Sequence, residues 1–322
     1  MHSALRILVA ALALMTITCF YYQISDLPHL NAILRQTPQA NTHASTTITS
    51  GDDSFSRSAP GFHIPQKGDT AEDSHPPKTD LSTAKDEASE LPNDKVVVMG
   101  ALSTDDVAWA TTKLHRWDAF VYTVDNNTTM PFHTDRNKGR EANAYLTHII
   151  QNYESLHTTV AFVHSHEFGW LRAWHTDAPR HSNVESLNSL NIDFVQRNGY
   201  ANLRCLPDPG CPDEVRPLRE PKDEGKTTEA VFAAAWREIF HNDDVPEVVG
   251  VACCAQFAVS KQQILQRTKE EYIRMHAWLM NTQLDDQVVG RVFEYLWHII
   301  FGQESVYCPS LAQCYRDVYG TR

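Results

Sequence analysis

The chain has 322 residues, of which 42% are hydrophobic, and this is enough for one sizeable globular domain. Its formal net charge is -12 at pH 7, so it lacks the basic surface with which general nucleic-acid-binding proteins attract phosphates. We therefore expect an acidic protein that does not bind nucleic acid, although a local basic pocket for an anionic ligand remains compatible with this charge.

The chain begins with a short apolar segment. Residues 7–22 carry no charge, Arg6 precedes them and Asp26 is the next charged residue. The segment is slightly shorter than the ~20 residues of a typical transmembrane helix, and it ends on bulky aromatic residues rather than the small residues that a signal peptidase requires. We predict a signal anchor over residues 1–23, with the rest of the chain in the lumen of the endoplasmic reticulum or Golgi. The alternative is a cleaved signal and a secreted protein.

A polar region follows the apolar segment. Residues 24–93 are rich in Ser, Thr, Asp and Pro and show no hydrophobic periodicity. Such a composition does not bury enough apolar surface to offset the entropy of the chain. We predict a disordered stem over these residues and a single lumenal α/β domain over residues 94–322.

The first half of that domain alternates between two kinds of pattern. Short apolar runs at 95–99, 118–123 and 158–163 are typical of buried strands. A helix that runs from a cap at Ser103 toward Leu114 lies between the first two strands. An amphipathic helix over 141–153 precedes the third. This alternation predicts a mainly parallel central sheet flanked by helices.

The second half is predominantly helical. A strand-like region covers residues 248–259, and its two apolar runs are separated by Cys253 and Cys254. Apolar periodicity predicts helices at 186–197, 227–240, 262–280 and 285–301.

The cysteines indicate an oxidising compartment. Cys19 lies in the apolar segment, and the other six are Cys205, Cys211, Cys253, Cys254, Cys308 and Cys314. An even number in a lumenal domain predicts disulfides, with 15 pairings open. The loops 205–211 and 308–314 either close on themselves or each tie to the adjacent pair. A zinc site is the alternative to disulfides.

Two overlapping sequons follow the second predicted strand. Asn126 and Asn127 each begin an Asn-x-Thr sequence, which is the acceptor for N-glycosylation. We therefore expect a glycoprotein with a surface turn at this position.

Histidines lie at the end of the third predicted strand. In an α/β sheet, ligands gather beyond the carboxyl ends of the parallel strands. His164 and His166 point to the same side of an extended chain, and His175 follows closely enough to be a third ligand. The pattern predicts a divalent metal site, to which Glu167 and Asp177 would add the oxygen ligands that manganese or magnesium prefers. Local hydrogen bonding of these histidines is the alternative.

A basic glycine loop precedes the helix at 141–153. Gly139 allows close approach of the backbone to a ligand, and Lys138 and Arg140 add positive charge beside the free N–H groups of a helix N-terminus. The loop therefore predicts phosphate binding. It matches neither a Walker loop nor a dinucleotide fingerprint, and a simple helix cap through Asn137 and Glu141 is the alternative.

The last predicted helix carries a third group of candidates. Arg291 and Glu294 lie one turn apart, and Asp286 lies near the start of the helix. Asp286 or Glu294 is a candidate general base, and Arg291 is a candidate anion ligand. A capping aspartate followed by an ion pair within the helix is the alternative.

Several sequence blocks are similar to a known family, and together they span roughly residues 96–319. The blocks are residues 137–142, 145–149, 162–166, 253–259 and 290–297. They resemble the fungal family catalogued as domain of unknown function 3431. That family implies no activity.

The order of elements has a more distant resemblance. A strand, a helix, a strand, a polar turn, a helix and an apolar strand with a polar motif at its end resemble the first half of GT-A-type nucleotide-sugar glycosyltransferases. In those enzymes an Asp-x-Asp motif holds manganese and the diphosphate. Here His164-Ser165-His166 takes its place, although a diphosphate-bound manganese normally has hard oxygen ligands.

The resemblance implies a membrane-anchored, lumenal enzyme that transfers a sugar from a nucleotide donor to a protein, a glycan or a small molecule. It implies a Mn or Mg ion near His164 and His166, and Asp286 or Glu294 as the group that orients or deprotonates the acceptor hydroxyl. The residues expected to hold the nucleotide are Lys138, Gly139, Arg140 and Arg291.

Two other functions remain open from the sequence. One is a metal-dependent hydrolase or secondary-metabolite tailoring enzyme built on His164, His166 and His175. The other is a lumenal binding module without catalytic activity, in which the histidines are structural.

Overall fold

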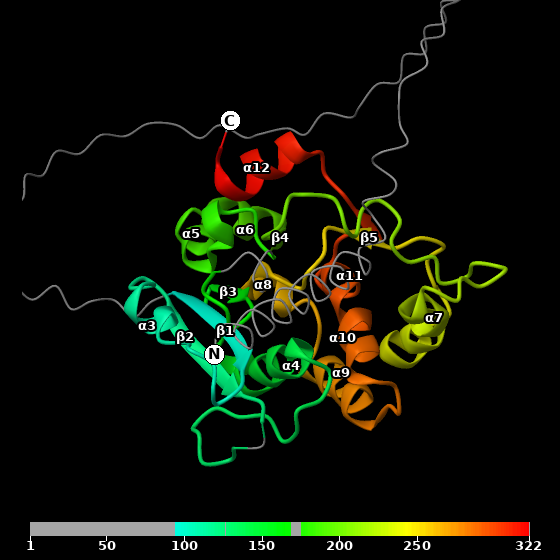
Figure 1. Ribbon diagram of the computed structural model, residues 1–322, viewed down its shortest axis with the longest axis horizontal. Coiled ribbons are helices and arrows are strands. Elements are labelled where there is room, and N and C mark those ends of the chain that lie inside the picture. The colour runs from blue at the N-terminus through cyan, green and yellow to red at the C-terminus, as the bar shows by residue number, and fades with distance from the viewer. Residues whose placement is uncertain (1–93, 126, 169–174, 322) are drawn as a thin grey trace, which may run out of the picture. The chain divides into compact units, whose positions relative to one another are not determined.

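The computed structural model describes residues 94–125, 127–168 and 175–321 (Figure 1). By its contacts the chain divides into residues 1–82 and 83–322, and the described residues belong to the second unit. The predicted anchor, the predicted stem and Asn126 lie outside the described residues. Within those ranges, each helix is too short or too polar to cross a membrane.

A five-stranded sheet forms the centre of the domain. Its strands are β1 (Lys95–Ala101), β2 (Asp118–Thr123), β3 (Thr159–Phe162), β4 (Tyr200–Asn202) and β6 (Phe257–Ser260). The order is β2-β1-β3-β6-β4. Strand β1 pairs in parallel with β2 and β3, whereas β6 runs antiparallel to β3 and β4. The α/β class with helices flanking a central sheet is confirmed. The sheet is mixed, because β1, β2, β3 and β4 run in one direction and β6 runs in the other.

The reversal of β6 follows from where its preceding loop lies. Phe257, the first residue of β6, pairs with Phe162 at the end of β3 and with Asn202 at the end of β4. Both ends of the connection between β4 and β6 therefore lie at the carboxyl edge of the parallel strands. Strand β6 starts from that edge and has to run the other way.

The described residues also include a two-stranded parallel sheet, ten α-helices and two short 3-10 helices. The strands of the two-stranded sheet are β5 (Gly250–Val251) and β7 (Val306–Tyr307). The α-helices are α3 (Trp109–Thr112), α4 (Glu141–Asn152), α5 (Asn183–Asn188), α6 (Ile192–Asn198), α7 (Thr227–Phe240), α8 (Lys261–Ile264), α9 (Lys269–Asn281), α10 (Asp286–Glu294), α11 (Trp297–Ile300) and α12 (Leu311–Tyr319). The 3-10 helices are η1 (Tyr153–Ser155) and η2 (Pro179–His181).

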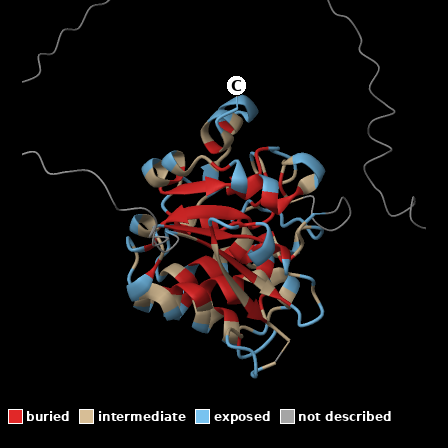
Figure 2. Cartoon of the chain, turned by 90° about the vertical axis from the view of Figure 1, so that its left-hand side faces the viewer, coloured by how far each residue is buried: buried red, intermediate tan, exposed pale blue. Residues whose placement is uncertain are grey.

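Helices cover both faces of the central sheet. Val96 and Val98 of β1 point into one buried cluster, which includes residues of α4, α7, α9 and α10, while Val97 and Met99 point into a second cluster with residues of α5, α6 and α12. Figure 1 shows these two groups of helices on opposite sides of the strands. The strands are buried between them in Figure 2, as continuous apolar runs predict.

Three of the predicted helices are each divided into two. Region 262–280 divides because Thr268 and Glu271 form a reciprocal capping box that starts α9. Region 186–197 divides because the Asn191 side chain accepts a hydrogen bond from Phe194 N and starts α6. Region 285–301 divides into α10 and α11, with Tyr295 and Leu296 between them.

The helix predicted from Ser103 is reduced to the four residues of α3. Ser103 does not cap it, because its N and Oγ both donate to Asp125 Oδ2, at 3.0 Å and 2.5 Å. Ser103 instead ties the end of β1 to the turn after β2.

The six cysteines form disulfides, as predicted, but the pairing differs from both expected patterns. The pairs are Cys205–Cys314, Cys211–Cys308 and Cys253–Cys254. The two short loops are tied to each other because α12, which the sequence analysis did not predict, lies against them. The adjacent cysteines bond to each other. All six sulfurs are thus bonded in disulfides, so none of these cysteines is a thiolate that could bind zinc.

Candidate functional site

A cleft opens at the carboxyl ends of β1 and β3. It consists of two cavities of about 240 Å³ and 280 Å³, and Arg140, Glu141 and His164 line both of them. Gly100 and Leu102 at the end of β1 line the first cavity, and Cys253 and Cys254 line the second. The cleft therefore lies at the edge of the sheet where ligands of α/β proteins normally bind.

The cleft brings together most of the predicted site residues from four separate parts of the chain. Those that line it are Arg140, His164, His166, His175, Arg291 and Glu294. Lys138, Gly139 and Asp286 do not line either cavity.

Those three residues instead form a structural contact beneath the cleft. Lys138 Nζ lies 3.7 Å from Asp286 Oδ1, and Gly139 N donates to the same oxygen at 3.3 Å. Gly139 has φ +71°, and a Cβ there would lie 2.7 Å from Leu279 Cγ. The contact fixes the loop against α9 and the start of α10, and it thereby positions Arg140.

Arg140 is an exposed cation in both cavities. It has φ 56° at the N-cap of α4, and among the described residues it makes no ion pair. Its stem crosses α10 at Gly290, where a Cβ would lie 2.7 Å from Arg140 Cγ. A glycine in α10 therefore allows the guanidinium to reach the cleft.

The backbone of His164 and His166 is held by buried side chains. His164 N donates to Gln256 Oε1 at 2.8 Å, and Asn183 Nδ2 donates to His166 O at 2.8 Å. Gln256 Nε2 in turn donates to Asn183 Oδ1. These amides, from the loop before β6 and from α5, fix the segment that follows β3.

Two imidazoles in the cleft are held in the neutral form. The rings of His164 and His175 are 4.4 Å apart at an angle of 68°. Burial, together with the nearby His175 and His166, lowers the pKa of His164 to about 3. Burial also lowers the pKa of His175 to about 4. His164 Nε2 is buried and has no hydrogen-bond partner among the described residues, so a ligand can use this nitrogen.

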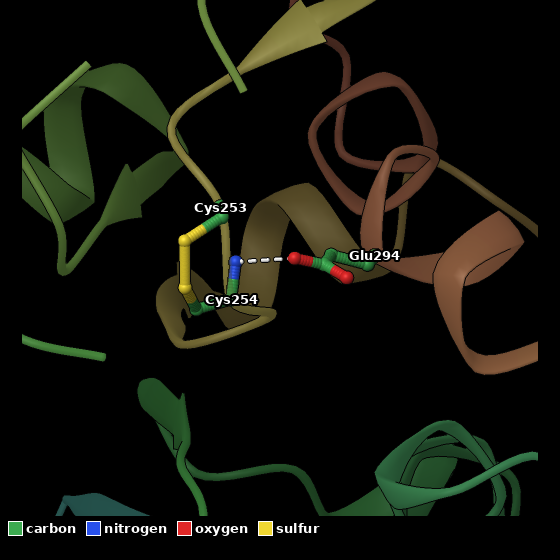
Figure 3. Close-up of side chains that lie close together, drawn as sticks. All are labelled: Cys253, Cys254 and Glu294. Atoms are coloured by element: carbon green, nitrogen blue, oxygen red, sulfur yellow. Dashed lines mark hydrogen bonds between the residues drawn. A yellow bond between two sulfur atoms is a disulfide. The ribbon is translucent and has the colours of Figure 1, made fainter. Parts of the chain in front are cut away.

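Two carboxyl groups share the cleft. Glu294 is only 13% exposed, its Oε1 accepts from Cys254 N at 2.7 Å (Figure 3), and its Oε2 lies 3.6 Å from Arg291 Nε. Burial raises the pKa of Glu294, against the effect of Arg291. Burial also raises the pKa of Glu141 to about 7, to which the charge of Glu294 contributes. A carboxyl group with a pKa of about 7, as in Glu141, exchanges protons near neutral pH.

Glu141 was not among the predicted site residues. As the first residue of an amphipathic helix it was interpreted as part of a cap that favours the helix dipole. Its position directly after Arg140, in the loop predicted to bind phosphate, was the available indication of a role in the site.

Cys253 and Cys254, which form a disulfide, line the second cavity of the cleft. Figure 3 shows this disulfide beside Glu294. Cys254 and Ala255 have φ of 97° and 50°, values that L-residues seldom adopt. In this conformation Cys254 N–H faces Glu294, and the backbone of Cys254 is also hydrogen-bonded to His164. One residue therefore orients both a carboxyl group and an imidazole.

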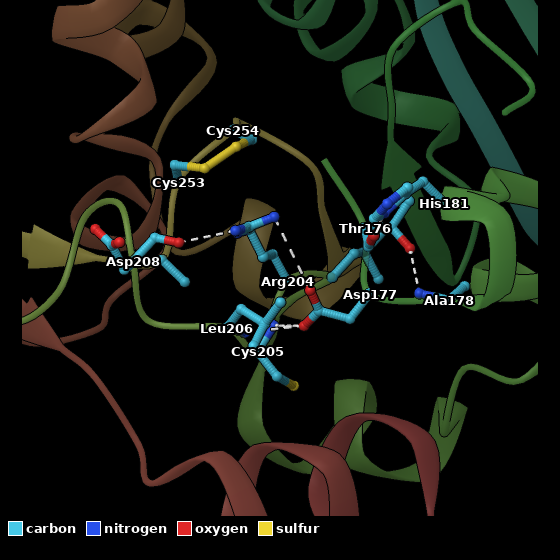
Figure 4. A network of polar contacts seen from close by, with 12 residues as sticks. Thr176, Asp177, Ala178, His181, Arg204, Cys205, Leu206, Asp208, Cys253 and Cys254 are labelled. Atoms are coloured by element: carbon cyan, nitrogen blue, oxygen red, sulfur yellow. Dashed lines mark hydrogen bonds and ion pairs between the residues drawn. A yellow bond between two sulfur atoms is a disulfide. The ribbon is translucent and has the colours of Figure 1, made fainter. Parts of the chain in front are cut away.

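The expected oxygen ligands Glu167 and Asp177 have other partners. Glu167 Oε1 lies 2.6 Å from Lys113 Nζ. Asp177 is 1% exposed, accepts from Cys205 N at 2.6 Å and faces Arg204 (Figure 4). Asp177 thus anchors the segment that carries His175 to the loop at Cys205.

In the described part of the chain, few candidate metal ligands lie close enough together to hold one ion. The one group of three candidate ligands within 4.8 Å of one another is Cys253, Cys254 and Glu294. Its two sulfurs are bonded to each other. The structure therefore brings no such group of three around His164, although His164 and His175 lie side by side.

The fold and the cleft define an α/β domain with a cleft lined by charged and polar side chains at the carboxyl edge of its parallel strands. The chain belongs to the family described as "protein of unknown function (DUF3431)", which matches residues 97–317. Neither a curated protein nor a solved structure is detectably similar to it. The resemblance to domain of unknown function 3431 is thereby confirmed, and the resemblance to GT-A-type enzymes stays a prediction.

Proposed function

We propose that the domain is a glycosyltransferase-like enzyme that transfers a sugar from a nucleotide donor to a hydroxyl group. One observation carries the proposal: the cleft combines the free guanidinium of Arg140 with two carboxyl groups, Glu141 and Glu294, of raised pKa. A nucleoside diphosphate requires a cation, and an acceptor hydroxyl requires a proton acceptor.

The order of elements supports the same proposal. Along the chain, β1, α3 and β2 are followed by the loop at Gly139, by α4 and by β3, and His164-Ser165-His166 follows β3. This is the order on which the resemblance to GT-A-type enzymes rests. The resemblance is an analogy of architecture, and the chemistry of the cleft carries the functional argument.

In the proposed reaction Arg140 and Arg291 bind the two phosphates of the donor. The acceptor oxygen forms a bond to the anomeric carbon of the sugar, and the bond from that carbon to the diphosphate oxygen breaks. The charge of Glu294 adds to the raised pKa of Glu141, and one of the two carboxyl groups, in its ionised form, accepts the proton of the acceptor hydroxyl. Asp286, which is bonded to Lys138 and Gly139, has no part in this step.

The resemblance also implies Mn or Mg. Among the described residues of the cleft, His164 Nε2 is a buried ligand atom without a partner, and it is a nitrogen. Hard divalent cations prefer several oxygen ligands, and the described residues bring no group of three candidate ligands together around His164, so the cleft does not match a manganese–diphosphate site. We therefore assign neutralisation of the diphosphate to Arg140 and Arg291.

Thermal shift measurements on the full-length protein test the proposal. UDP, GDP and their sugars are the ligands, Arg140→Ala is the variant, and Arg197→Ala is the control because Arg197 is an exposed arginine away from the cleft. A nucleoside diphosphate should raise the melting temperature of the wild type and of the control. Arg140→Ala removes one charged hydrogen-bonding group. We therefore expect this variant to bind the nucleoside diphosphate more weakly than the wild type, by about tenfold or more.

Two outcomes would overturn the proposal. One is the absence of any shift with these nucleotides, and the other is equal affinity of Arg140→Ala and the wild type. Release of UDP or GDP from the matching sugar donor should follow binding, and it should be lost in the variant.

A second function has its own support, from the histidines. His164 and His175 are adjacent and neutral, which is the form that binds a metal. This favours a metal-dependent hydrolase or tailoring enzyme. Activity with zinc or iron in the absence of nucleotide, abolished in His164→Ala, would support it over sugar transfer.

We also propose that the protein is a single-pass type II membrane glycoprotein of the endoplasmic reticulum or Golgi. The support is the apolar segment within residues 1–23, the disulfides and the sequons at Asn126 and Asn127. A mature N-terminus near Gln23, found by N-terminal sequencing, would identify a cleaved signal and contradict this proposal.

A further inference from the structure

A third cavity of about 420 Å³ lies between α10 and the segment that leads into α7. These two helices pack against each other (Figure 1). We call this the side cavity, and the lining residues that matter here are Glu214, Thr227, Thr228, Gln287, Arg291 and Tyr295.

The side cavity adjoins the cleft. Gln287 and Arg291, one turn apart on α10, line both. Arg291 Nη2 lies 3.4 Å from Glu214 Oε1 in the side cavity, and Arg291 Nε lies 3.6 Å from Glu294 Oε2 in the cleft. A single ridge of side chains therefore separates the two spaces.

Among the described residues, the charged side chains around the side cavity are paired except Asp285, an exposed carboxylate. Glu214 lies within ion-pair distance of Lys226, at 3.8 Å, as well as Arg291. Glu229, 5% exposed, pairs with Arg219 at 2.7 Å. The groups left to interact with a ligand include hydroxyls and an amide, which bind neutral hydroxylated molecules better than anions.

Tyr295 adds an independent observation. Its side chain is 1% exposed and lines the side cavity, and its hydroxyl has no hydrogen-bond partner among the described residues. A buried hydroxyl without a partner is unfavourable, and such groups commonly mark a place that a ligand or water fills.

We propose that the side cavity binds the neutral, polyhydroxylated part of the acceptor, a glycan or glycoside. The reacting hydroxyl of such an acceptor extends past Arg291 and Gln287 into the cleft. This assignment rests on the proposed sugar transfer and specifies its acceptor class.

Saturation-transfer NMR on the full-length protein tests the assignment. Maltose and α-1,2-mannobiose are the neutral ligands, and glucose 6-phosphate is the anionic comparison. Thr228→Trp places an indole in the side cavity, and Thr111→Trp is the control because Thr111 is an exposed threonine on α3. We expect at least one disaccharide to bind the wild type and the control, with affinity reduced about tenfold or more in Thr228→Trp. Glucose 6-phosphate should bind more weakly than the disaccharides.

A second variant covers the case in which Thr228→Trp does not fold. Tyr295→Phe removes only the hydroxyl without a partner and should also weaken disaccharide binding, by roughly tenfold if that hydroxyl bonds to the ligand. Equal disaccharide affinity in wild type and the folded variants, or no binding to wild type, would overturn the assignment.

UDP and GDP binding, measured on the same samples, separates this assignment from the proposed function. The nucleotides should bind Thr228→Trp as they bind the wild type, because Thr228 does not line the cleft. Disaccharide binding that depends on Thr228 without any nucleotide binding would preserve the side cavity as a carbohydrate site and refute sugar transfer.

Discussion

At the scale of single residues, two glycines without chemistry of their own determine where Arg140 lies. Gly139 precedes Arg140 with φ +71° and packs against Leu279, while Gly290 lets the stem of Arg140 cross α10. The sequence pattern indicated close approach of a backbone at Gly139. It did not indicate that the neighbour would be a leucine of α9 rather than a ligand, because periodicity does not tell which helices pack together.

We expect Gly139→Ala to destabilise the protein more than Gly320→Ala. Both glycines have positive φ, of +71° and +63°, so both substitutions incur a backbone cost of about 1 kcal/mol. Only at Gly139 does the new Cβ meet Leu279, and such overpacking adds roughly 1–3 kcal/mol. Urea denaturation gives both values. Equal free energies of unfolding for the two variants would show that the close packing at Leu279 has no effect.

Glu141 gives a prediction about pH. Its folded-state pKa of about 7 lies above the ordinary value of 4.5, so the folded protein binds this proton more tightly than the unfolded chain does. The stabilisation is full below pH 4.5 and is lost as the pH rises toward 7. We therefore expect the wild type to lose stability relative to Glu141→Gln over that window, with no further change above it.

The comparison of the wild type with Glu141→Gln over this pH range contains its own control. The lowered pKa of His164 acts in the opposite direction, because it makes both proteins less stable in acid. This effect of His164 is present in the wild type and in Glu141→Gln, so it cancels in the difference between their stabilities. Parallel curves of melting temperature against pH, for wild type and Glu141→Gln, would contradict the raised pKa.

At the scale of elements, the sequence predicted the strands and the loop that form the cleft better than it predicted the sheet as a whole. Strands β1, β2 and β3 are continuous apolar runs, and the helix α4 follows a regular period. An apolar run has no direction, so the antiparallel course of β6 was not predictable from it. The breaks at Thr268 and Asn191 depend on side-chain caps that interrupt a pattern otherwise typical of one helix.

The loop at Cys253–Cys254 carries a prediction at this scale. The disulfide closes a very short loop, so its removal should change the entropy of the unfolded chain little. It should, however, release the backbone conformation in which Cys254 N–H donates to Glu294. In the variant Cys253→Ala/Cys254→Ala we expect faster hydrogen exchange at the amide of residue 254 and a melting temperature within a few degrees of the wild type.

Cys205→Ala/Cys314→Ala is the matched comparison, because it removes a disulfide of long sequence separation outside the cleft wall. It should lower the melting temperature clearly and leave exchange at Cys254 unchanged below its unfolding transition. Unaltered exchange at residue 254 in the first variant would show that the disulfide does not hold this loop.

At the scale of the whole molecule, the long-range disulfides are the part that the sequence left most open. Cys205–Cys314 and Cys211–Cys308 span separations of 109 and 97 residues. Six cysteines allow 15 pairings, and the choice depends on the tertiary position of α12, whose packing no local pattern reveals. The predicted anchor and stem lie outside the described residues and stay predictions.

We expect all six cysteines of the described domain to resist alkylation in the unreduced protein. Reduction should then lower the melting temperature substantially, because each long-range disulfide contributes about 2–4 kcal/mol. Mass spectrometry of the alkylated protein, before and after dithiothreitol, makes the measurement. Alkylation of Cys205, Cys211, Cys308 or Cys314 without reductant would contradict the pairing.

The two long-range disulfides also make residues 212–307 a covalently closed loop. Residues 220–225, within it, are all exposed, so a protease such as trypsin has access to Lys222. After a cut at Lys222, the two disulfides would still link the fragment that carries His164 to the fragment that carries Glu294. The two fragments would separate into two bands only on a reducing gel. The cleft can thus survive a cut in its own polypeptide.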